Sequence, residues 1–481
     1  MKRFNCLNST VALAAMLSAC SGGGSGSVSQ PGGGGGGVAV TPTPTATTAA
    51  ACSVRDRQDW AAAQLREWYL FPETLPATLD PAPYSTVDAY VDALTATARA
   101  QRRDRFFTYV TSIAEENAFY ASGSSAGFGF RLSYEPTRVF VSEAFEGTAA
   151  SGASIDRGAE ILAIGTSSAS LRSVSSILSS EGSAGVTNAL GPSTPGTTRV
   201  LRVADANGTR EVTLAKTDYA LTPVSSRYGA KIINDGAKKV GYVNLRTFIS
   251  TADPALRAAF ADFRAQGVTE FIIDFRYNGG GLVSIADLMG NLLGRNRSTS
   301  DVFSYTTFRA SKSVNNETTY FSPQPQSVAP VKIAFIGTGG TASASELVMN
   351  SFIPYLHANA ALIGANTYGK PVGQIAIDRT QCDDRLRVIA FALENAAHQG
   401  TYYNGLAGTM EATCQAADDV TRPLGDPLEA STRTALDYLA GRSCTRLATG
   451  GGQGALSVSN RRELLIPERP STAQRETPGL F

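Results

Sequence analysis

Histidine is scarce in this chain, and its scarcity limits the chemistry available to the protein. Only two histidines, His357 and His398, occur among the 481 residues. No H-E-x-x-H pattern appears, so a metal site of that type has little support. His357 lies too far along the helix predicted after Ser343 to reach back to its start. A serine nucleophile in this chain is therefore expected to use a base other than histidine.

The chain also lacks an excess of charge and a long apolar run. Lysine and arginine number 42 against 41 aspartates and glutamates. No basic cluster of the kind that contacts phosphates appears, so we expect no nucleic-acid partner. Beyond the N-terminus there is no stretch of about 18 apolar residues, and we expect no spanning helix in the mature chain. The length allows about two to four domains.

The N-terminus has the pattern of a secretion signal. Lys2 and Arg3 precede a short apolar core at 11–17, and the letters "LSAC" that end at Cys20 resemble a bacterial lipobox. We expect residues 1–19 to be a lipoprotein signal peptide and Cys20 to carry lipid. The alternative is a plain signal peptide that is cleaved after a small residue.

A low-complexity stretch follows the predicted lipidation site. Residues 20–50 are rich in glycine, serine, threonine and proline, a composition that cannot bury a core and predicts a flexible linker. Because Ser21 rather than aspartate follows Cys20, we expect a lipoprotein of the cell envelope, in the outer membrane facing the periplasm or the cell exterior. The lipid on Cys20 would be the contact with the membrane.

Four cysteines remain once Cys6 leaves with the signal and Cys20 takes lipid. An even number of cysteines in an exported protein predicts disulfides, and sequence alone leaves the pairing open. A metal site has weaker support, because no two of them are closely spaced and neither histidine stands beside one. The four are Cys52, Cys382, Cys414 and Cys444.

The pattern of apolar residues divides the rest of the chain into four parts and predicts an α/β, multidomain protein. Residues 51–118 have helical periodicity and are expected to form a small N-terminal helical domain. Residues 119–220 read as strands and turns. Residues 221–445 alternate strands with helices, which predicts an α/β core with a partly parallel sheet. The tail 446–481 is expected to be loosely ordered.

The strand-rich part resembles a PDZ domain of the kind found in secreted processing proteases. It contains "GFGF", followed by "ASGASIDRGAEILAIG". Consecutive backbone N–H groups in a Gly-rich turn can bind the C-terminal carboxylate of a peptide. The resemblance implies such a site, and an ordinary cluster of hairpin glycines is the alternative. The residues of this loop are Gly127, Phe128, Gly129 and Phe130.

Two serines stand where a buried strand leads into a helix, in "VKIAFIGTGGTASASELVMNSF". A helix start offers unpaired N–H groups and a positive field, and the amide of Ala344 can face a developing oxyanion. Ser343 is therefore a candidate nucleophile. Because Ser343 and Glu346 also fit the pattern of a capping box, a purely structural role is the alternative.

Three glycines, Gly279–Gly281, end another apolar strand in "FIIDFRYNGGGLVS". Ligands bind at the C-terminal ends of strands in open α/β sheets, and glycines let the backbone approach them. A phosphate loop is the rival interpretation, and it fails because no Lys-Ser or Lys-Thr pair follows at the required spacing. We expect an oxyanion donor here and favour Gly280.

A lysine lies in the Gly-rich turn "GANTYGKPVGQ" after a further apolar strand. Lysine acts as a general base only when it is neutral, so Lys370 would have to be enclosed enough to lower its pKa. Gln374 follows four residues later. The alternative is an ordinary solvated loop lysine.

Taken in this order, the stretches resemble the carboxyl-terminal processing (tail-specific) peptidases. The match covers about 125–440: a PDZ-like unit, a D-x-R-x-N-x-G-G strand end, "SASE", and G-x-x-x-x-G-K-x-x-x-Q. The resemblance implies a crotonase/ClpP-like core with neither metal nor cofactor. It implies a Ser–Lys dyad, in which Ser343 attacks, Lys370 takes its proton and Gln374 orients the lysine, with Gly280 and Ala344 as oxyanion donors.

Two departures from the family pattern affect the edge of the site. The interval between Ser343 and Lys370 is slightly long, and "LAGTMEATC" stands where relatives often show Pro-Asp. The expected activity is that of a secreted, lipid-anchored serine endopeptidase acting on unfolded or C-terminal-tail-exposed polypeptides. The alternative is a catalytically silent, PDZ-containing peptide-binding lipoprotein. The sequence leaves the oligomeric state open.

Overall fold

The computed structural model describes residues 52–448 and 462–481. These residues all belong to one compact unit, Thr48–Phe481. The predicted signal peptide 1–19, the lipidation site Cys20 and the linker 20–50 lie outside the described residues. None of the helices that the structure describes is both long enough and apolar enough to cross a membrane.

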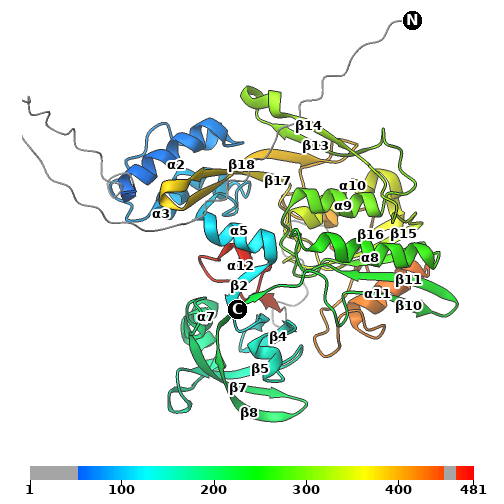
Figure 1. The fold of residues 1–481 in the computed structure, drawn as a ribbon, viewed down its shortest axis with the longest axis horizontal. Coiled ribbons are helices and arrows are strands. Elements are labelled where there is room, and N and C mark those ends of the chain that lie inside the picture. The colour runs from blue at the N-terminus through cyan, green and yellow to red at the C-terminus, as the bar shows by residue number, and fades with distance from the viewer. Residues whose placement is uncertain (1–51, 449–461) are drawn as a thin grey trace, which may run out of the picture. The chain divides into compact units, whose positions relative to one another are not determined.

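Six strands form the central sheet of the α/β part (Figure 1). Five of them run parallel, and β10 pairs antiparallel with β11 at one edge. Parallel strands are buried on both faces, which accounts for unbroken apolar runs such as "FII" in the middle of the sheet. The predicted partly parallel sheet is confirmed. In sheet order the strands are β10 (Ala230–Asp235), β11 (Lys238–Asn244), β12 (Glu270–Asp274), β15 (Lys332–Gly337), β16 (Ala360–Gly364) and β19 (Ala412–Gln415).

Helices cover both faces of this sheet. Leu256, Met289 and Leu347, from three different helices, belong to one buried cluster, and Leu436 belongs to a second cluster on the opposite face. The sheet therefore has a closed hydrophobic layer on each side, and its polar side chains collect at the strand ends. The helices are α8 (Ala252–Ala265), α9 (Val283–Leu292) and α10 (Ala344–Leu356) on one face and α11 (Ala430–Leu439) on the other.

A second, antiparallel sheet makes up most of the predicted PDZ-like part. Helix α7 packs on it through Val174, Ile177 and Leu190. Its path runs β20-β3-β4-β5-β7-β8, and β6 joins at β5. The elements are β3 (Phe130–Glu135), β4 (Arg138–Ala144), α6 (Ala149–Gly152), β5 (Glu160–Gly165), β6 (Arg172–Ser173), α7 (Val174–Leu190), β7 (Thr198–Asp205) and β8 (Gly208–Ala215). Close by in the chain, β2 (Ser124–Gly127) pairs with β9 (Thr217–Ala220).

A third sheet carries the N-terminal helices. Leu65 and Val91 from these helices are buried in one cluster with Leu386 and Ile389 of β18. The helical part thus shares its core with a strand from a distant stretch of the sequence. The elements are α2 (Val54–Trp68), α3 (Val87–Leu94), α4 (Ala96–Ala100), β1 (Tyr109–Ser112), α5 (Ile113–Ser122), β13 (Val302–Phe308), β14 (Glu317–Tyr320), β17 (Val372–Arg379) and β18 (Asp384–Glu394).

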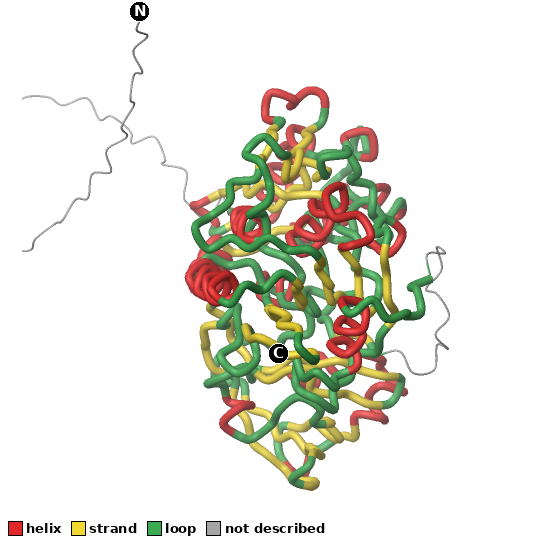
Figure 2. Tube along the Cα trace, turned by 90° about the vertical axis from the view of Figure 1, so that its right-hand side faces the viewer, coloured by secondary structure: helices red, strands yellow, loops and turns green. Residues whose placement is uncertain are grey.

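The prediction of a loosely ordered tail over 446–481 is wrong for residues 462–481. This segment forms β20 (Glu463–Leu464) and α12 (Thr472–Glu476). Leu480 and Phe481 are only 2% and 3% exposed, and the C-terminus lies among the strands (Figure 1 and Figure 2). The segment is ordered because its apolar side chains are buried and its backbone pairs with the open edge of β3.

Both expected disulfides are present. Cys52 pairs with Cys382 across 330 residues of sequence, and Cys414 pairs with Cys444 across 30 residues. The first bridge ties the segment preceding α2 to the turn between β17 and β18. It therefore reinforces the attachment of the N-terminal helices to the third sheet.

The two bridges differ in the length of chain that they close, which gives a test of their contributions. A cross-link restricts the unfolded chain more when its loop is longer, by about 2 kcal/mol for this difference in length. We therefore expect Cys52→Ser with Cys382→Ser to lower the free energy of unfolding more than Cys414→Ser with Cys444→Ser. Denaturant titration under non-reducing conditions measures both. An equal or reversed order would contradict the loop-closure argument.

Candidate active site

Ser343 occupies the junction between β15 and α10 in a strained conformation. Its φ is 56° and its ψ is −115°, a region that non-glycine residues rarely adopt. Such strain persists only where the surrounding structure enforces it, and it is concentrated at functional sites. Ser343 is half-buried, and it precedes Ala344, the first residue of α10, so its side chain stands at the helix start.

One buried carboxylate joins the Ser343 turn to the Lys370 turn. Glu346 Oε2 accepts hydrogen bonds from the N–H of Ser343 at 3.0 Å and from the N–H of Lys370 at 2.8 Å. Glu346 Oε1 accepts from the N–H of Gly369 at 2.7 Å. The side chain of Glu346 therefore holds the two turns within the reach of a single carboxylate. The predicted capping role of Glu346 is only part of what this residue does.

Glu346 is fully buried. Burial raises the pKa of Glu346, and the hydrogen bonds from the backbone N–H groups lower it in part. A neutral side chain would satisfy the three N–H groups less well than a carboxylate does. Sequence reasoning missed this second role because the contact to Lys370 joins residues 24 positions apart.

The amine of Lys370 lies in an enclosed environment at the start of the β17 hairpin. Its Nζ donates to Gln374 Oε1 at 2.9 Å and lies 5.1 Å from the centroid of the Phe107 ring. Gln374 Nε2 in turn donates to the carbonyl oxygen of Phe107, which fixes the amide with its oxygen toward the lysine. Burial lowers the pKa of Lys370, and the nearby carboxylate of Glu476 opposes that shift. Among the described residues, Gln374 is the hydrogen-bond acceptor for Nζ.

The glycine run lies directly beside Ser343. A Cβ placed on Gly280, whose φ is +122°, would lie 2.7 Å from the Cβ of Ser343. The N–H of Gly280 donates to Asn278 Oδ1 at 2.9 Å and is already occupied. The N–H of Gly279 instead donates to a carbonyl oxygen from another segment, that of Glu476, at 2.9 Å. Both amides are thus hydrogen-bonded, that of Gly280 to a side chain two residues earlier and that of Gly279 to a different segment of the chain.

The strand-end motif before the glycines has a structural role that the sequence did not reveal. Arg276 donates to Asp274 at 2.7 Å and to Glu429 at 2.8 Å, and all three side chains are fully buried. Asn278 Nδ2 donates to the carbonyl oxygen of Leu245 at 2.8 Å. These paired charges and hydrogen bonds fix the backbone that carries the glycines.

The Gly127–Phe130 loop forms a second site where backbone N–H groups converge. The N–H groups of Gly129 and Phe130 donate to the main-chain oxygen of Phe481 at 3.0 and 3.2 Å. Gly129 has a φ of +86°, and a Cβ there would lie 2.1 Å from the side chain of Thr148. Only glycine fits this position. Phe128 is fully buried in the core of the antiparallel sheet.

The two histidines lie on the surface. His357 contacts Glu411 at 2.8 Å, and His398 stacks on Tyr305 with ring centroids 4.2 Å apart. Both side chains are about two-thirds exposed, at 67% and 65%. Within residues 52–448 and 462–481, no three His, Cys, Asp or Glu side chains are grouped so as to hold a metal ion.

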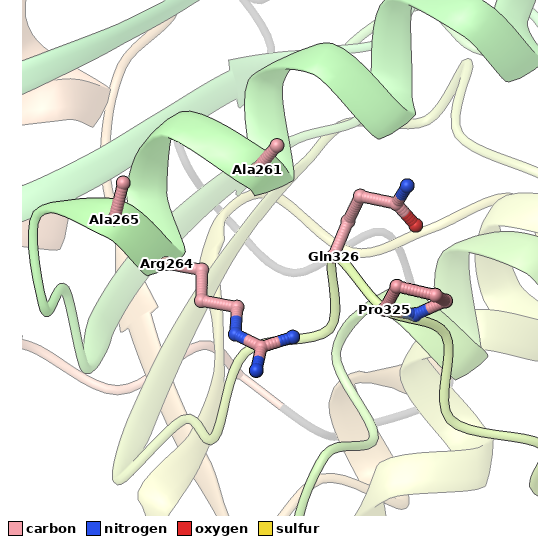
Figure 3. A pocket seen from close by; sticks show the side chains of 5 residues that line it. All are labelled: Ala261, Arg264, Ala265, Pro325 and Gln326. Atoms are coloured by element: carbon pink, nitrogen blue, oxygen red, sulfur yellow. The ribbon is translucent and has the colours of Figure 1, made fainter.

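A pocket lies beside the C-terminal part of α8 (Figure 3). None of the predicted site residues lines it. It offers a single charged side chain, Arg264, and carries no catalytic constellation. Its lining residues are Ala261, Arg264, Ala265, Pro325 and Gln326.

Comparisons with known proteins point to one peptidase family. The model of Peptidase family S41 matches residues 239–403. The chain is 29% identical to carboxyl-terminal-processing peptidase 1, chloroplastic, of Arabidopsis thaliana over 46% of its own length and 42% of that protein. It is 26% identical to a carboxyl-terminal-processing protease of a Picosynechococcus species over 52% of its length and 55% of that protein. The chain thus spans about half the length of these relatives.

A solved structure shares the fold. A putative S41 protease from Bacteroides fragilis superimposes with a TM-score of 0.60 at 21% identity, over 79% of this chain and 97% of that one. The similarity extends well beyond residues 239–403 and supports the multidomain α/β arrangement. At this identity it concerns the fold alone.

The Glu346 contacts predict a measurable effect of removing one charge. Glu346→Gln would turn an N–H donor toward backbone N–H groups, so we expect the free energy of unfolding to fall by about 1–3 kcal/mol. Amide hydrogen exchange of Ser343, Gly369 and Lys370 should become faster. Glu411→Gln, which changes a half-exposed carboxylate, is the control and should alter neither quantity. Unchanged exchange at these amides in Glu346→Gln would show that the carboxylate does not hold the turns.

Proposed function

We propose that this protein is a serine endopeptidase that cleaves polypeptides with a Ser343–Lys370 dyad, because the model of Peptidase family S41 matches residues 239–403. The observation that carries the proposal is the shared carboxylate of Glu346, which binds the backbone of both residues. A helix cap alone would need the contact to Ser343 but not those to Gly369 and Lys370.

The chemistry begins with neutral Lys370. Its amine accepts the proton of Ser343 Oγ as that oxygen attacks the peptide carbonyl carbon. The peptide C–N bond then breaks, and the ammonium of Lys370 returns its proton to the leaving amine. Water next attacks the acyl-enzyme, Lys370 accepts its proton, and Ser343 regains a hydrogen as the ester bond breaks. Each step needs the lysine within hydrogen-bond reach of Ser343.

A lysine serves this purpose only if its pKa falls toward the working pH. Burial lowers the pKa of Lys370, and Gln374 holds the amine without adding a charge. The long, flexible side chain of Lys370 turns from Gln374 toward Ser343 when substrate is bound. We assign Gln374 the role of orienting the lysine between these steps.

The oxyanion of the tetrahedral intermediate needs N–H donors on the same side as Ser343. We propose the amides of Ala344 and Gly279. Ala344 is the first residue of α10, where N–H groups lack intrahelical partners. Gly279 already donates to a peptide carbonyl oxygen. Two preorganised donors at such a position are worth several powers of ten in rate.

The dyad is tested by removing each member separately. We expect Ser343→Ala and Lys370→Ala each to reduce casein cleavage by at least about a thousandfold, with circular dichroism unchanged. Ser313→Ala and Lys238→Ala, at exposed positions, are matched controls that should keep full activity. Activity that survives Lys370→Ala would end the dyad proposal. Absence of cleavage by the unaltered chain would favour a catalytically silent peptide-binding protein.

We also propose that the protein is exported and held at the cell envelope by lipid on Cys20. The lipobox-like "LSAC" and the Gly- and Ser-rich stretch after it support this localisation. The two disulfides, which form in oxidising compartments, agree with export.

The anchor is tested by fractionation. Cys20→Ala should move the protein from the membrane fraction to the soluble fraction of the cell envelope, because the chain would lose its lipid. Cys6→Ala, within the predicted signal, is the control and should leave the distribution unchanged. Continued membrane association of Cys20→Ala would contradict the lipid anchor.

A further inference from the structure

The C-terminal segment occupies the open edge of β3 in two places. Near its start, Glu463 and Leu464 pair antiparallel with Tyr134 and Ser133. At its end, Leu480 pairs antiparallel with Arg131. Main-chain hydrogen bonds run from the N–H of Leu132 to Gly479 at 2.8 Å and from the N–H of Phe481 to Phe130 at 2.9 Å. The last residues thus bind as an added strand, the mode by which sheets capture extended peptides.

The side chains of the last two residues are buried in separate apolar clusters. Leu480 packs with Phe119, Phe145 and Ile249. Phe481 belongs to the cluster of Phe128 and the antiparallel sheet. A Cβ on Gly127 would lie 2.7 Å from the main-chain carbon of Phe481, so the backbone of Phe481 packs directly on Gly127. The edge of β3 therefore fits an extended segment that carries an apolar residue followed by an aromatic one.

Between its two paired stretches the segment reaches the candidate catalytic residues. The backbone of α12 lies on Gly279, where a Cβ would be 2.2 Å from the carbonyl oxygen of Arg475. Arg475 also donates to the carbonyl oxygen of Phe106 at 3.1 Å and stacks 3.8 Å from the Tyr109 ring centroid. Helix α12 is therefore fixed from both sides over the glycine run.

The conformation of α12 is that of a blocker and not of a substrate. A peptidase substrate binds in an extended conformation, with its amides hydrogen-bonded to the protein. The backbone of Thr472–Glu476 instead forms a helical turn. The buried carboxylate of Glu476, which accepts a hydrogen bond from Tyr120 at 2.9 Å, also opposes the lowering of the Lys370 pKa by burial. The charge of Arg475 lowers the pKa of Lys370, and its effect is weaker than that of Glu476. The segment thus covers the amide that would bind substrate.

We propose that residues 462–481 are a tethered competitor that occupies the groove beside β3 and closes the Ser343 site. External polypeptides with a free C-terminus ending in an apolar–aromatic pair would displace it. This inference rests on the proposed peptidase function for its effect on activity, but the exchange of one C-terminus for another in the groove does not depend on catalysis.

The experiment separates binding from cleavage. The probe is a fluorescent peptide with the sequence TAQRETPGLF and a free carboxylate, measured by anisotropy on the full chain carrying Ser343→Ala. Leu480→Glu is added to expel the tail, because a buried glutamate without a partner is costly. We expect the probe to bind at least about tenfold more tightly to this double variant. The same peptide with a C-terminal amide should bind at least about tenfold more weakly.

Two further variants guard against misfolding. Leu428→Glu changes an exposed leucine and should leave probe binding as in the parent chain. Extending the chain by Gly-Ser-Gly-Ser after Phe481 keeps every core residue and adds residues where Phe481 packs tightly against Gly127. We expect the extension to raise probe affinity as Leu480→Glu does. Equal probe affinity in the parent, the Leu480→Glu chain and the extended chain would overturn the proposal.

Cleavage then reports on regulation. With Ser343 present, we expect Leu480→Glu and the extended chain to cleave casein several-fold faster than the parent. Tighter probe binding without cleavage in any variant would refute the proposed peptidase activity but still support displacement of the tail. Cleavage that is equally fast in parent and variants, with unchanged probe binding, would refute the role of the tail as a competitor but still support the proposed peptidase activity.

Discussion

The carboxylate of Glu346 is the constraint on which the candidate site depends. It binds N–H groups from both the Ser343 turn and the Lys370 turn, and these turns follow different strands of the sheet. A buried anion with three charge-assisted hydrogen bonds tolerates little displacement of its partners. The strained φ of Ser343 is sustained by this contact and by the start of α10. The turns that carry serine and lysine are thus brought together by contacts to their backbone N–H groups.

A second set of buried contacts fixes the glycine run against this pair. Arg276, Asp274 and Glu429 form a paired cluster beneath the strand end, and Arg131 links β3 to the same region through the carbonyl oxygen of Tyr277 at 2.8 Å. Arg131 also donates to Pro478 of the tail at 2.6 Å. The peptide groove and the glycine run are therefore coupled by one buried guanidinium. Arg131 thus connects the tail on β3 to the turn that carries the glycine run.

Local patterns in the sequence predicted the parallel sheet, the helix start at Ser343 and the disulfides, because each depends on short-range periodicity or on composition. The second role of Glu346 was not predictable, since it depends on a contact to residues in another turn. The hydrogen bond of the Gly280 amide depends on Asn278, whose side-chain direction no pattern reveals. The ordered structure of the tail was not predicted, because its few apolar residues pack into the hydrophobic cores of other parts of the chain and form no core of their own.

Reaction with a fluorophosphonate probe, followed by mass spectrometry of the labelled peptide, examines the Ser343–Lys370 pair most directly. Such reagents modify serine hydroxyls that a neighbouring base activates. In a chain whose tail is released by Leu480→Glu, we expect labelling at Ser343 and its loss when Lys370→Ala is added. Labelling at a different serine, or equal labelling of Ser343 with and without the lysine, would contradict the Ser343–Lys370 dyad.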